Sequence, residues 1–247
     1  MPPKRSGLGQ SKVDAPQPAH ARRAARRQQV ASGGAIGRRQ FILQIATRRF
    51  AAAGFEATTV RQIADEANIL SGSLYHHFST KEDMLHEIVL QPVLDMRDEA
   101  IRIAHLPLDA EQRLITLISA ELHRLTSQYE VYSIAFNERK RFRVNALFSD
   151  VVQAKKDGYL AWHDVLKEGT HEGLFDSAIN FQMTISTIIR ILNMGADWYK
   201  NEDIADGGTA VSYSLNQLLD FYLGFILRSI RAPHRSNEPI RQPTTLS

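Results

Sequence analysis

Apolar residues recur at a helical period from about residue 38 to about residue 231, and no segment alternates between apolar and polar residues as a strand does. Glycine and proline are sparse between these bounds. Apolar residues make up 43 % of the 247, which is enough for a substantial core. The pattern therefore predicts an all-α fold.

Start and stop signals divide this region into helices. Gly54 ends a first helix that contains Ile42 and Phe50, and Thr59 and Gln62 have the spacing of a capping box. Pro92 is expected to kink a longer helix. The later helices are expected at Thr59–Ala67, Ser71–His77, 79–105, Asp109–Gln128, Tyr129–Arg141, Val144–Glu172, Asp176–Tyr199 and Thr209–Arg231.

Two polar tails flank the helical region. Residues 1–37 contain almost no large apolar residue and are predicted to form a disordered arm, and residues 233–247, with three prolines, form a second tail. Residues 1–40 carry nine Lys/Arg against one Asp, although the whole chain has a net charge of only +3. A basic arm on an acidic body indicates either a polyanionic partner or a solubilising extension.

Several classes of protein are disfavoured. The chain has no cysteine, no apolar run long enough to span a bilayer and no secretory signal, which indicates a cytoplasmic protein without membrane contact. His76 and His77 are adjacent, so they point about 100° apart on a helix and do not suit one metal ion. Phosphate loops, nucleophile elbows and acid/base pairs are absent, so no enzymatic activity, cofactor or metal is expected. A helical enzyme or an adaptor remains the alternative.

The segment Thr58–Lys81 is the most informative. Two short helices are joined by about three residues from Asn68, and small or apolar side chains such as Ala64 and Leu74 let them cross. The turn after Ala67 needs a residue that tolerates positive φ, and asparagine is suited to that conformation. Residues 59–78 are therefore predicted to form a helix-turn-helix.

The second helix of this motif begins with small residues, which allow close approach to DNA. Tyr75 and His76 are expected to contact DNA, and His77 either contacts DNA or bonds within the domain. Lys81 is expected to meet a phosphate because a cation is unfavourable at a helix N-terminus. Arg61 reaches either the DNA backbone or solvent. The predicted DNA-binding residues are Thr59, Arg61, Ser71, Gly72, Ser73, Tyr75, His76, His77 and Lys81.

These motifs, in order and spacing, resemble the DNA-binding domain of TetR-family transcriptional regulators over about residues 36–96. The matching residues are Phe50, Gly54, Thr58-Thr59, Ile63-Ala64, Gly72 to Phe78 and Lys81-Glu82. Asn68 stands where the family usually has glycine. The resemblance implies an all-α homodimer that represses transcription, with residues 97–232 binding a ligand and the second subunit. The implied partners are double-stranded operator DNA and a small-molecule effector.

Further segments, among them Ile69 to Phe78, Glu138 to Arg141 and Trp162 to Leu166, are similar to actinobacterial repressors of steroid-ring catabolism. That similarity implies a coenzyme A thioester as the effector and lipid or steroid catabolism as the regulated process. A regulator of drug efflux is the alternative.

Two sets of side chains are assigned within the larger domain. Aromatic residues at helical spacing line either a ligand pocket or an ordinary core, and the basic run Arg139–Arg143 meets either an anionic ligand head or solvent. The predicted pocket residues are Tyr132, Phe136, Arg139, Trp162, Phe181 and Ile185. Two apolar stripes near the C-terminus pack either within the subunit or, as the resemblance implies, across a dimer. The predicted interface residues are Ile188, Leu192, Leu215, Leu219, Tyr222, Leu223 and Ile226.

Overall fold

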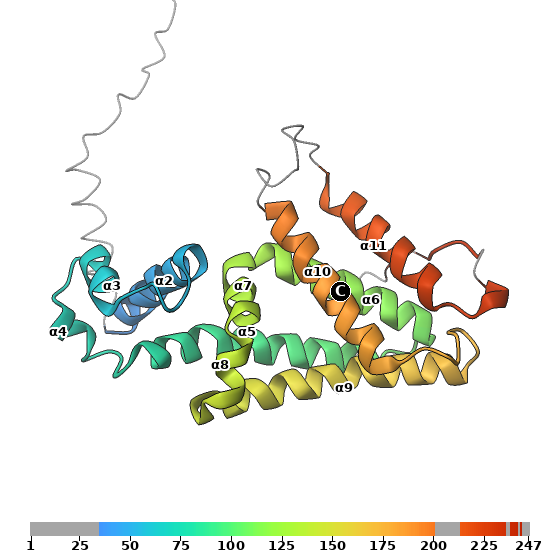
Figure 1. Ribbon diagram of the computed structural model, residues 1–247, viewed down its shortest axis with the longest axis horizontal. Coiled ribbons are helices and arrows are strands. Elements are labelled where there is room, and N and C mark those ends of the chain that lie inside the picture. The colour runs from blue at the N-terminus through green and yellow to red at the C-terminus, as the bar shows by residue number, and fades with distance from the viewer. Residues whose placement is uncertain (1–34, 201–212, 236–237, 242, 244–247) are drawn as a thin grey trace, which may run out of the picture. The chain divides into compact units, whose positions relative to one another are not determined.

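The computed structural model describes residues 35–200, 213–235, 238–241 and 243, and within these ranges the secondary structure is entirely helical (Figure 1). The predicted all-α fold is confirmed. The basic residues of the arm and the start of the helix predicted from Thr209 lie outside the described residues. No helix in the described ranges is long and apolar enough to cross a membrane.

The first four described helices begin close to the predicted positions. They are α2 (Ala35–Ala53), α3 (Val60–Ala67), α4 (Ser71–Leu74) and α5 (Lys81–Ala104). Gly54 ends α2 in the left-handed region at φ +86°, and α5 continues through Pro92 as one helix. Thr59 caps α3 and Thr80 caps α5, each in a capping box that satisfies backbone N–H groups left free at a helix start.

The remaining helices differ from the prediction at four boundaries, including the start of the helix expected from Thr209, whose N-cap is Ser214. They are α6 (Ala110–Ser127), α7 (Tyr129–Asn137), α8 (Arg139–Val144), η1 (Ala146–Phe148), α9 (Ser149–His171), α10 (Phe181–Lys200), α11 (Leu215–Ile230) and η3 (Pro233–Arg235). The expected helix 129–141 breaks at Glu138, and the next helix starts later because the Asn145 side chain caps η1. The helix expected from Asp176 begins at Phe181.

The segment before α10 is held as a loop by the core. Gly173 turns the chain at φ +73°, and Phe175 then lies buried beside Arg231. The Phe175 ring packs so closely over Gly169 of α9 that a Cβ there would lie 2.3 Å from its Cε2 atom. Burial of this ring outweighs the helical period that predicted a longer helix.

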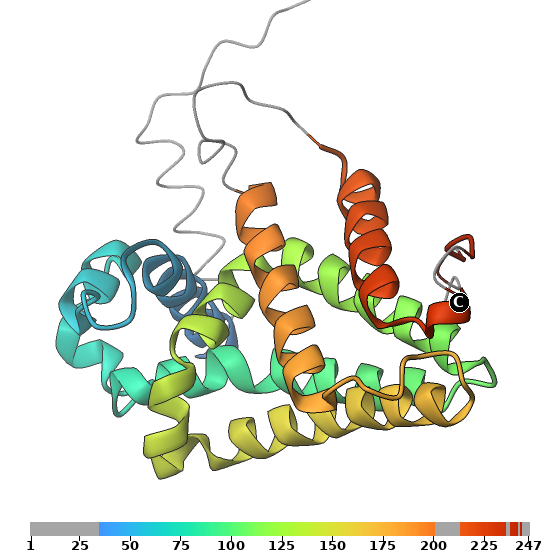
Figure 2. The ribbon, with the colours of Figure 1, turned by 45° about the vertical axis from the view of Figure 1, so that its right-hand side comes forward.

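The long helices α5 and α9 pack along each other, and α6 and α10 cover them (Figure 1). α10 and α11 lie side by side at another face of this domain (Figure 2). One buried apolar cluster unites α5, α6, α9, α10 and α11, with Leu114, Ile115 and Leu166 fully inaccessible to solvent.

The second predicted tail is partly ordered, contrary to the prediction. Arg231 and Arg235 are buried, and Ile240 packs against the core cluster. Arg231 donates to both carboxylate oxygens of Glu111 at 2.9 and 2.8 Å, and both side chains are 1 % exposed. Its guanidinium also donates to the backbone carbonyls of Glu238 and Pro239. Hydrogen bonds to a buried arginine therefore hold residues that their composition assigned to a tail.

Candidate DNA-binding and effector sites

The helix-turn-helix is built as the sequence predicts. Asn68 ends α3 with φ 58° and ψ 45°, the left-handed conformation expected of the turn. Ile63, Ala64 and Leu74 are completely buried, so α3 and α4 share a small core. This core fixes the crossing of the two helices and therefore the surface that they present.

The second helix of the motif is shorter than predicted. α4 comprises Ser71–Leu74 only, and the chain continues as a turn to Phe78. Tyr75, at 55 % exposure, and His76 are exposed on this turn, as is Gly72 on α4. Ser71, Ser73 and His77 are half-buried.

Two predicted contacts belong to α3. Thr59 is exposed, but its hydroxyl already takes part in the capping box, accepting from the Gln62 backbone N–H at 3.2 Å. The Arg61 side chain is 84 % exposed and lies 3.8 Å from Asp65, one turn further along the helix. Arg61 is thus free to extend toward a phosphate.

Lys81 is placed differently from the prediction. Its ammonium group donates to the backbone carbonyls of Phe55 at 2.7 Å and Thr58 at 3.0 Å, and lies 4.2 Å from the centre of the Phe55 ring. The lysine therefore fastens the start of α5 to the loop between α2 and α3. Backbone carbonyls in that loop, rather than an outside anion, account for a cation at this helix start.

Leu70 was not among the predicted contacts. It occupies the N-cap of α4 without a side-chain capping bond and is 80 % exposed. The sequence did contain a signal for Leu70. An apolar residue at an N-cap lacks the side-chain hydrogen bond that usually stabilises a helix start, which indicates another role for that side chain. An exposed apolar side chain at this position suits contact with a thymine methyl group.

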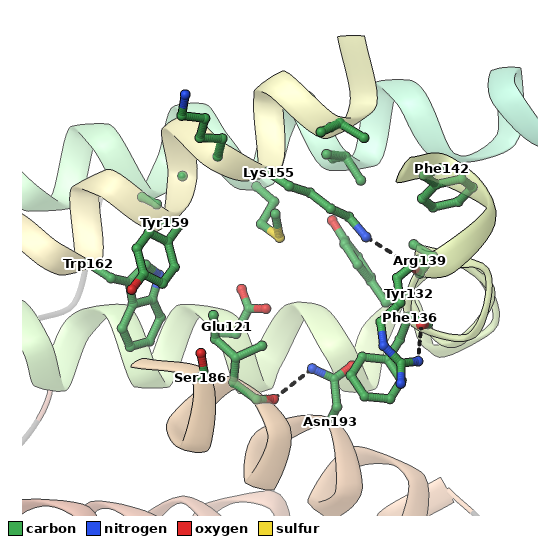
Figure 3. A pocket seen from close by; sticks show the side chains of 18 of the residues that line it. Glu121, Tyr132, Phe136, Arg139, Phe142, Lys155, Tyr159, Trp162, Ser186 and Asn193 are labelled. Atoms are coloured by element: carbon green, nitrogen blue, oxygen red, sulfur yellow. Dashed lines mark hydrogen bonds between the residues drawn. The ribbon is translucent and has the colours of Figure 1, made fainter. Parts of the chain in front are cut away.

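The second candidate site is a cavity of about 410 Å³ in the larger domain (Figure 3). Tyr132, Phe136, Arg139 and Trp162 line it as predicted. Phe181 instead borders a more open groove that adjoins the cavity and shares Ser186 with it. Ile185 is completely buried in the core cluster and lines neither space, so its assignment to the pocket was wrong.

Basic side chains surround the otherwise apolar cavity. They come from α8, α9 and α10, and they are Arg139, Arg143, Lys155, Lys156 and Arg190. Arg143, Lys156 and Arg190 are exposed. Within the predicted basic run, Arg139 and Arg143 therefore line the cavity, whereas Lys140 faces solvent and Arg141 lies against the DNA-binding domain.

Arg141 makes the contact between α8 and the helix-turn-helix domain. Its guanidinium pairs with Glu56, lies 3.9 Å from Glu82 at the start of α5, and stacks 4.4 Å from the centre of the Phe55 ring. Glu138, at 3.0 Å, orients it from its own segment. The six-residue helix α8 thus carries cavity residues and a DNA-domain contact together.

Glu121 and Lys155 lie in the cavity and were also missed. Burial raises the pKa of Glu121 to about 7, although nearby Lys155 opposes this, and burial lowers the pKa of Lys155 to about 8. Tyr132 hydrogen-bonds to the Pro92 carbonyl at 2.8 Å, and burial raises its pKa well above the usual value. Glu121 and Lys155 are ordinary charged residues of two amphipathic helices, and nothing in the sequence indicated that their side chains would lie in the same cavity.

The residues predicted to form the dimer interface lie largely in the core of a single subunit. Within one subunit, the side chains of Leu192, Leu219 and Leu223 are at most 5 % exposed, and the other predicted residues are buried or half-buried. The 3.6-residue stripe packs against α6 and the rest of the core cluster, so it is not available to a second subunit. Large exposed apolar residues on these helices lie elsewhere: Met183, Met194, Phe221 and Phe225.

An exposed helix-turn-helix beside a helical domain with its own cavity defines a DNA-binding regulator that responds to a small molecule. Residues 42–88 match the model of bacterial regulatory proteins of the tetR family, and residues 107–228 match the tetracyclin repressor-like C-terminal domain. The chain is 31 % identical over 203 residues to the HTH-type transcriptional repressor KstR2 of Rhodococcus jostii, covering 82 % of this chain and 96 % of that protein. It is 34 % identical to KstR2 of Mycolicibacterium smegmatis, covering 78 % and 90 % respectively.

Solved structures agree with these matches. The ketosteroid transcriptional regulator KstR2 of Mycobacterium tuberculosis superposes with a TM-score of 0.67 at 32 % identity, covering 78 % of this chain and 95 % of that one. AibR, solved with isovaleryl coenzyme A and operator DNA, shares the fold with a TM-score of 0.62 at 19 % identity, covering 76 % and 97 %. The chain therefore belongs to the TetR family of transcriptional regulators. As a member it binds operator DNA as a homodimer and takes a small-molecule effector.

Proposed function

We propose that this protein is a cytoplasmic, non-enzymatic repressor that leaves its operator when a coenzyme A thioester of a largely apolar acid occupies the cavity. Three KstR2 repressors named among its relatives support a role in steroid or lipid catabolism. The cavity is lined mainly by apolar side chains and has exposed cations at its edge, which fits a largely apolar acyl group joined to an anionic nucleotide.

The two-sided position of α8 is the observation that carries the proposal. Arg139, Phe142 and Arg143 face the cavity, and Arg141 between them holds Phe55 and Glu56 of the DNA-binding domain. An occupant that displaces α8 therefore also displaces the loop between α2 and α3, which leads into the helix-turn-helix and which Lys81 ties to the start of α5. The coupling is reciprocal, since operator DNA must weaken effector binding by the same factor.

Arg141→Met is expected to uncouple the two sites. The thioester should weaken operator binding of the wild-type protein by roughly 5–150-fold, the usual range of allosteric coupling, and that of the variant by a factor close to one. Affinities for operator and for thioester separately should change little. The measurement is a pair of operator titrations, one without and one with dodecanoyl coenzyme A. Each is monitored by the fluorescence anisotropy of labelled DNA.

Lys140→Met is the matched control, because Lys140 lies beside Arg141 on α8 but is exposed. It should retain wild-type coupling. If the wild-type operator complex resists long-chain thioesters and yields to small cationic drugs, the chain regulates efflux instead. If Arg141→Met releases DNA as the wild type does, α8 is not the coupling element.

We further propose that Tyr75 and His76 contact bases, and that Arg61 contacts a phosphate. His76→Ala should weaken binding to the selected operator by about 1–3 kcal/mol and leave random duplex unaffected. Arg61→Ala should weaken both and lower the slope of log affinity against log salt by roughly 1. Lys81→Met should instead lower the melting temperature, because the backbone carbonyls of Phe55 and Thr58 lose their hydrogen bonds to the ammonium group.

Operator duplexes for this test are obtained by repeated selection from random DNA, and each variant is titrated at several salt concentrations. If Arg61→Ala changes the sequence preference and His76→Ala weakens binding to operator and random duplex equally, α4 is not the element in the major groove.

A further inference from the structure

Two ionisable side chains extend into the cavity among aliphatic and aromatic neighbours (Figure 3). Glu121 comes from α6 and is 7 % exposed, and Lys155 comes from the facing helix α9. Burying a charge in a largely apolar cavity is costly unless hydrogen bonds compensate, and here the compensation is partial: Glu121 pairs with Arg124, and Lys155 bonds to one backbone carbonyl.

The hydrogen-bonding capacity of this pair is only partly used. The Lys155 ammonium donates one N–H to the Ala135 carbonyl at 2.8 Å, and its nitrogen lies 5.2 Å from the centre of the Phe142 ring. Among the described residues Ala135 is the acceptor it uses, which leaves two N–H groups for water or a ligand. Glu121 accepts from Arg124 at 2.9 Å and turns into the cavity.

The charges around the pair favour an acceptor over a donor on the ligand. Arg139 and Arg143 act on Lys155 together with Glu121, so the local charge is positive. Because burial raises the pKa of Glu121 to about 7, its carboxyl group is partly protonated near neutral pH, and Lys155, with a pKa of about 8, is mostly charged. Both side chains can then donate a hydrogen bond.

We propose that Glu121 and Lys155 form a polar subsite that binds a carbonyl or carboxylate oxygen carried on the otherwise apolar acyl body of the effector. A purely hydrocarbon occupant would remove water from both groups without replacing its hydrogen bonds. A site built to hydrogen-bond an oxygen rejects the analogue that lacks it, because the buried polar groups are left unpaired. The pair therefore selects among acyl groups, and the proposal rests on the proposed function in taking the cavity as the effector site.

The test compares matched thioesters on the intact protein by tryptophan fluorescence, since Trp162 lines the cavity. The probes are dodecanoyl coenzyme A, the mono-thioester of dodecanedioic acid, and isomers with one oxo group at different carbons of the chain. At least one oxygenated probe should bind wild-type protein about tenfold or more tightly than dodecanoyl coenzyme A. A preference for oxo isomers assigns a carbonyl, and a preference for the diacid assigns a carboxylate.

Lys155→Met should reduce this preference to less than about threefold while dodecanoyl coenzyme A binds as well as before or better. Glu121→Gln, which keeps an acceptor for Arg124, should reduce it in part. Lys156→Met is the control: its exposed side chain lies at the edge of the same cavity, so all thioesters should weaken alike and the preference should persist. Equal binding of all probes to wild-type protein, or a preference that survives in Lys155→Met, overturns the proposal.

A second series separates this proposal from the identity of the effector. The methyl esters of the same acids lack coenzyme A and are measured in the same way. If the thioesters fail to bind but wild-type protein prefers oxygenated esters and Lys155→Met does not, the subsite is supported and the thioester assignment is wrong. If neither series shows a preference for oxygen, the subsite is wrong whatever the effector.

Discussion

Glu111→Gln is expected to lower the free energy of unfolding by about 3–5 kcal/mol, the usual effect of leaving one partner of a buried ion pair without its counter-charge. Arg231 and Glu111 are each 1 % exposed and joined by two hydrogen bonds, so water cannot replace the lost carboxylate. Arg231 also holds the carbonyls of Glu238 and Pro239, and the ordered residues after α11 should loosen together with it. Urea unfolding at fixed protein concentration measures the effect.

Arg241→Gln is the matched control. Arg241 pairs with Asp109 near the same end of α6, but its side chain is 43 % exposed. Loss of an exposed pair should cost less than about 1 kcal/mol. Replacing both buried partners, Glu111→Leu with Arg231→Met, should be less harmful than either single change, since no charge is then left unpaired. If Glu111→Gln and Arg241→Gln have similar urea midpoints, the buried ion pair stabilises the fold no more than the exposed pair does.

Phe225→Glu is expected to convert the dimer into a monomer and to abolish tight binding to a palindromic operator. We propose that Phe221, Phe225, Met183 and Met194 form the dimer contact, because they are the large apolar side chains that α10 and α11 leave exposed. Phe221 and Phe225 stack with ring centres 6.4 Å apart, so they form one continuous apolar patch. A carboxylate buried there without a partner should weaken association by about 3–5 kcal/mol. Half-site contacts from one subunit cannot then support the two-site complex.

Sedimentation velocity and operator titration test this assignment together. Leu160→Glu, at a residue of α9 that is 46 % exposed, introduces the same charge away from α10 and α11 and should leave the dimer intact. Leu219→Glu should unfold the subunit instead of releasing a folded monomer, because Leu219 is part of the core. A folded monomer from Leu219→Glu and a dimer from Phe225→Glu would restore the original assignment.

The sequence was most informative where local geometry alone decides structure. Thr59 and Gln62 form the capping box that their spacing predicts, and Asn68 adopts the positive φ expected of it. Four of the six predicted pocket residues line the cavity, and three of those four are aromatic residues on helix faces that point into this domain. Such features depend on residues a few positions apart, and no knowledge of the tertiary structure is needed to find them.

Features that depend on distant partners could not be predicted in this way. Arg231 is separated from Glu111 by 120 residues, and Lys81 from the Phe55 carbonyl by 26. The apolar stripe on α11 gives the same period whether it packs within a subunit or between two. Only the tertiary structure shows that Leu219 and Leu223 already pack in the core cluster together with residues of α6.

The division of one expected helix into α7 and α8 has a consequence for how a ligand enters. Helices of nine and six residues are marginal by themselves and depend on their neighbours for stability. Backbone amides in residues 129–145 should therefore exchange with deuterium faster than those of α5 and α9, whose long contact forms the centre of the domain. Transient unfolding of this wall would open the cavity, and occupancy should slow that exchange. The same segment then acts both as the entrance for the effector and as the element that transmits its binding.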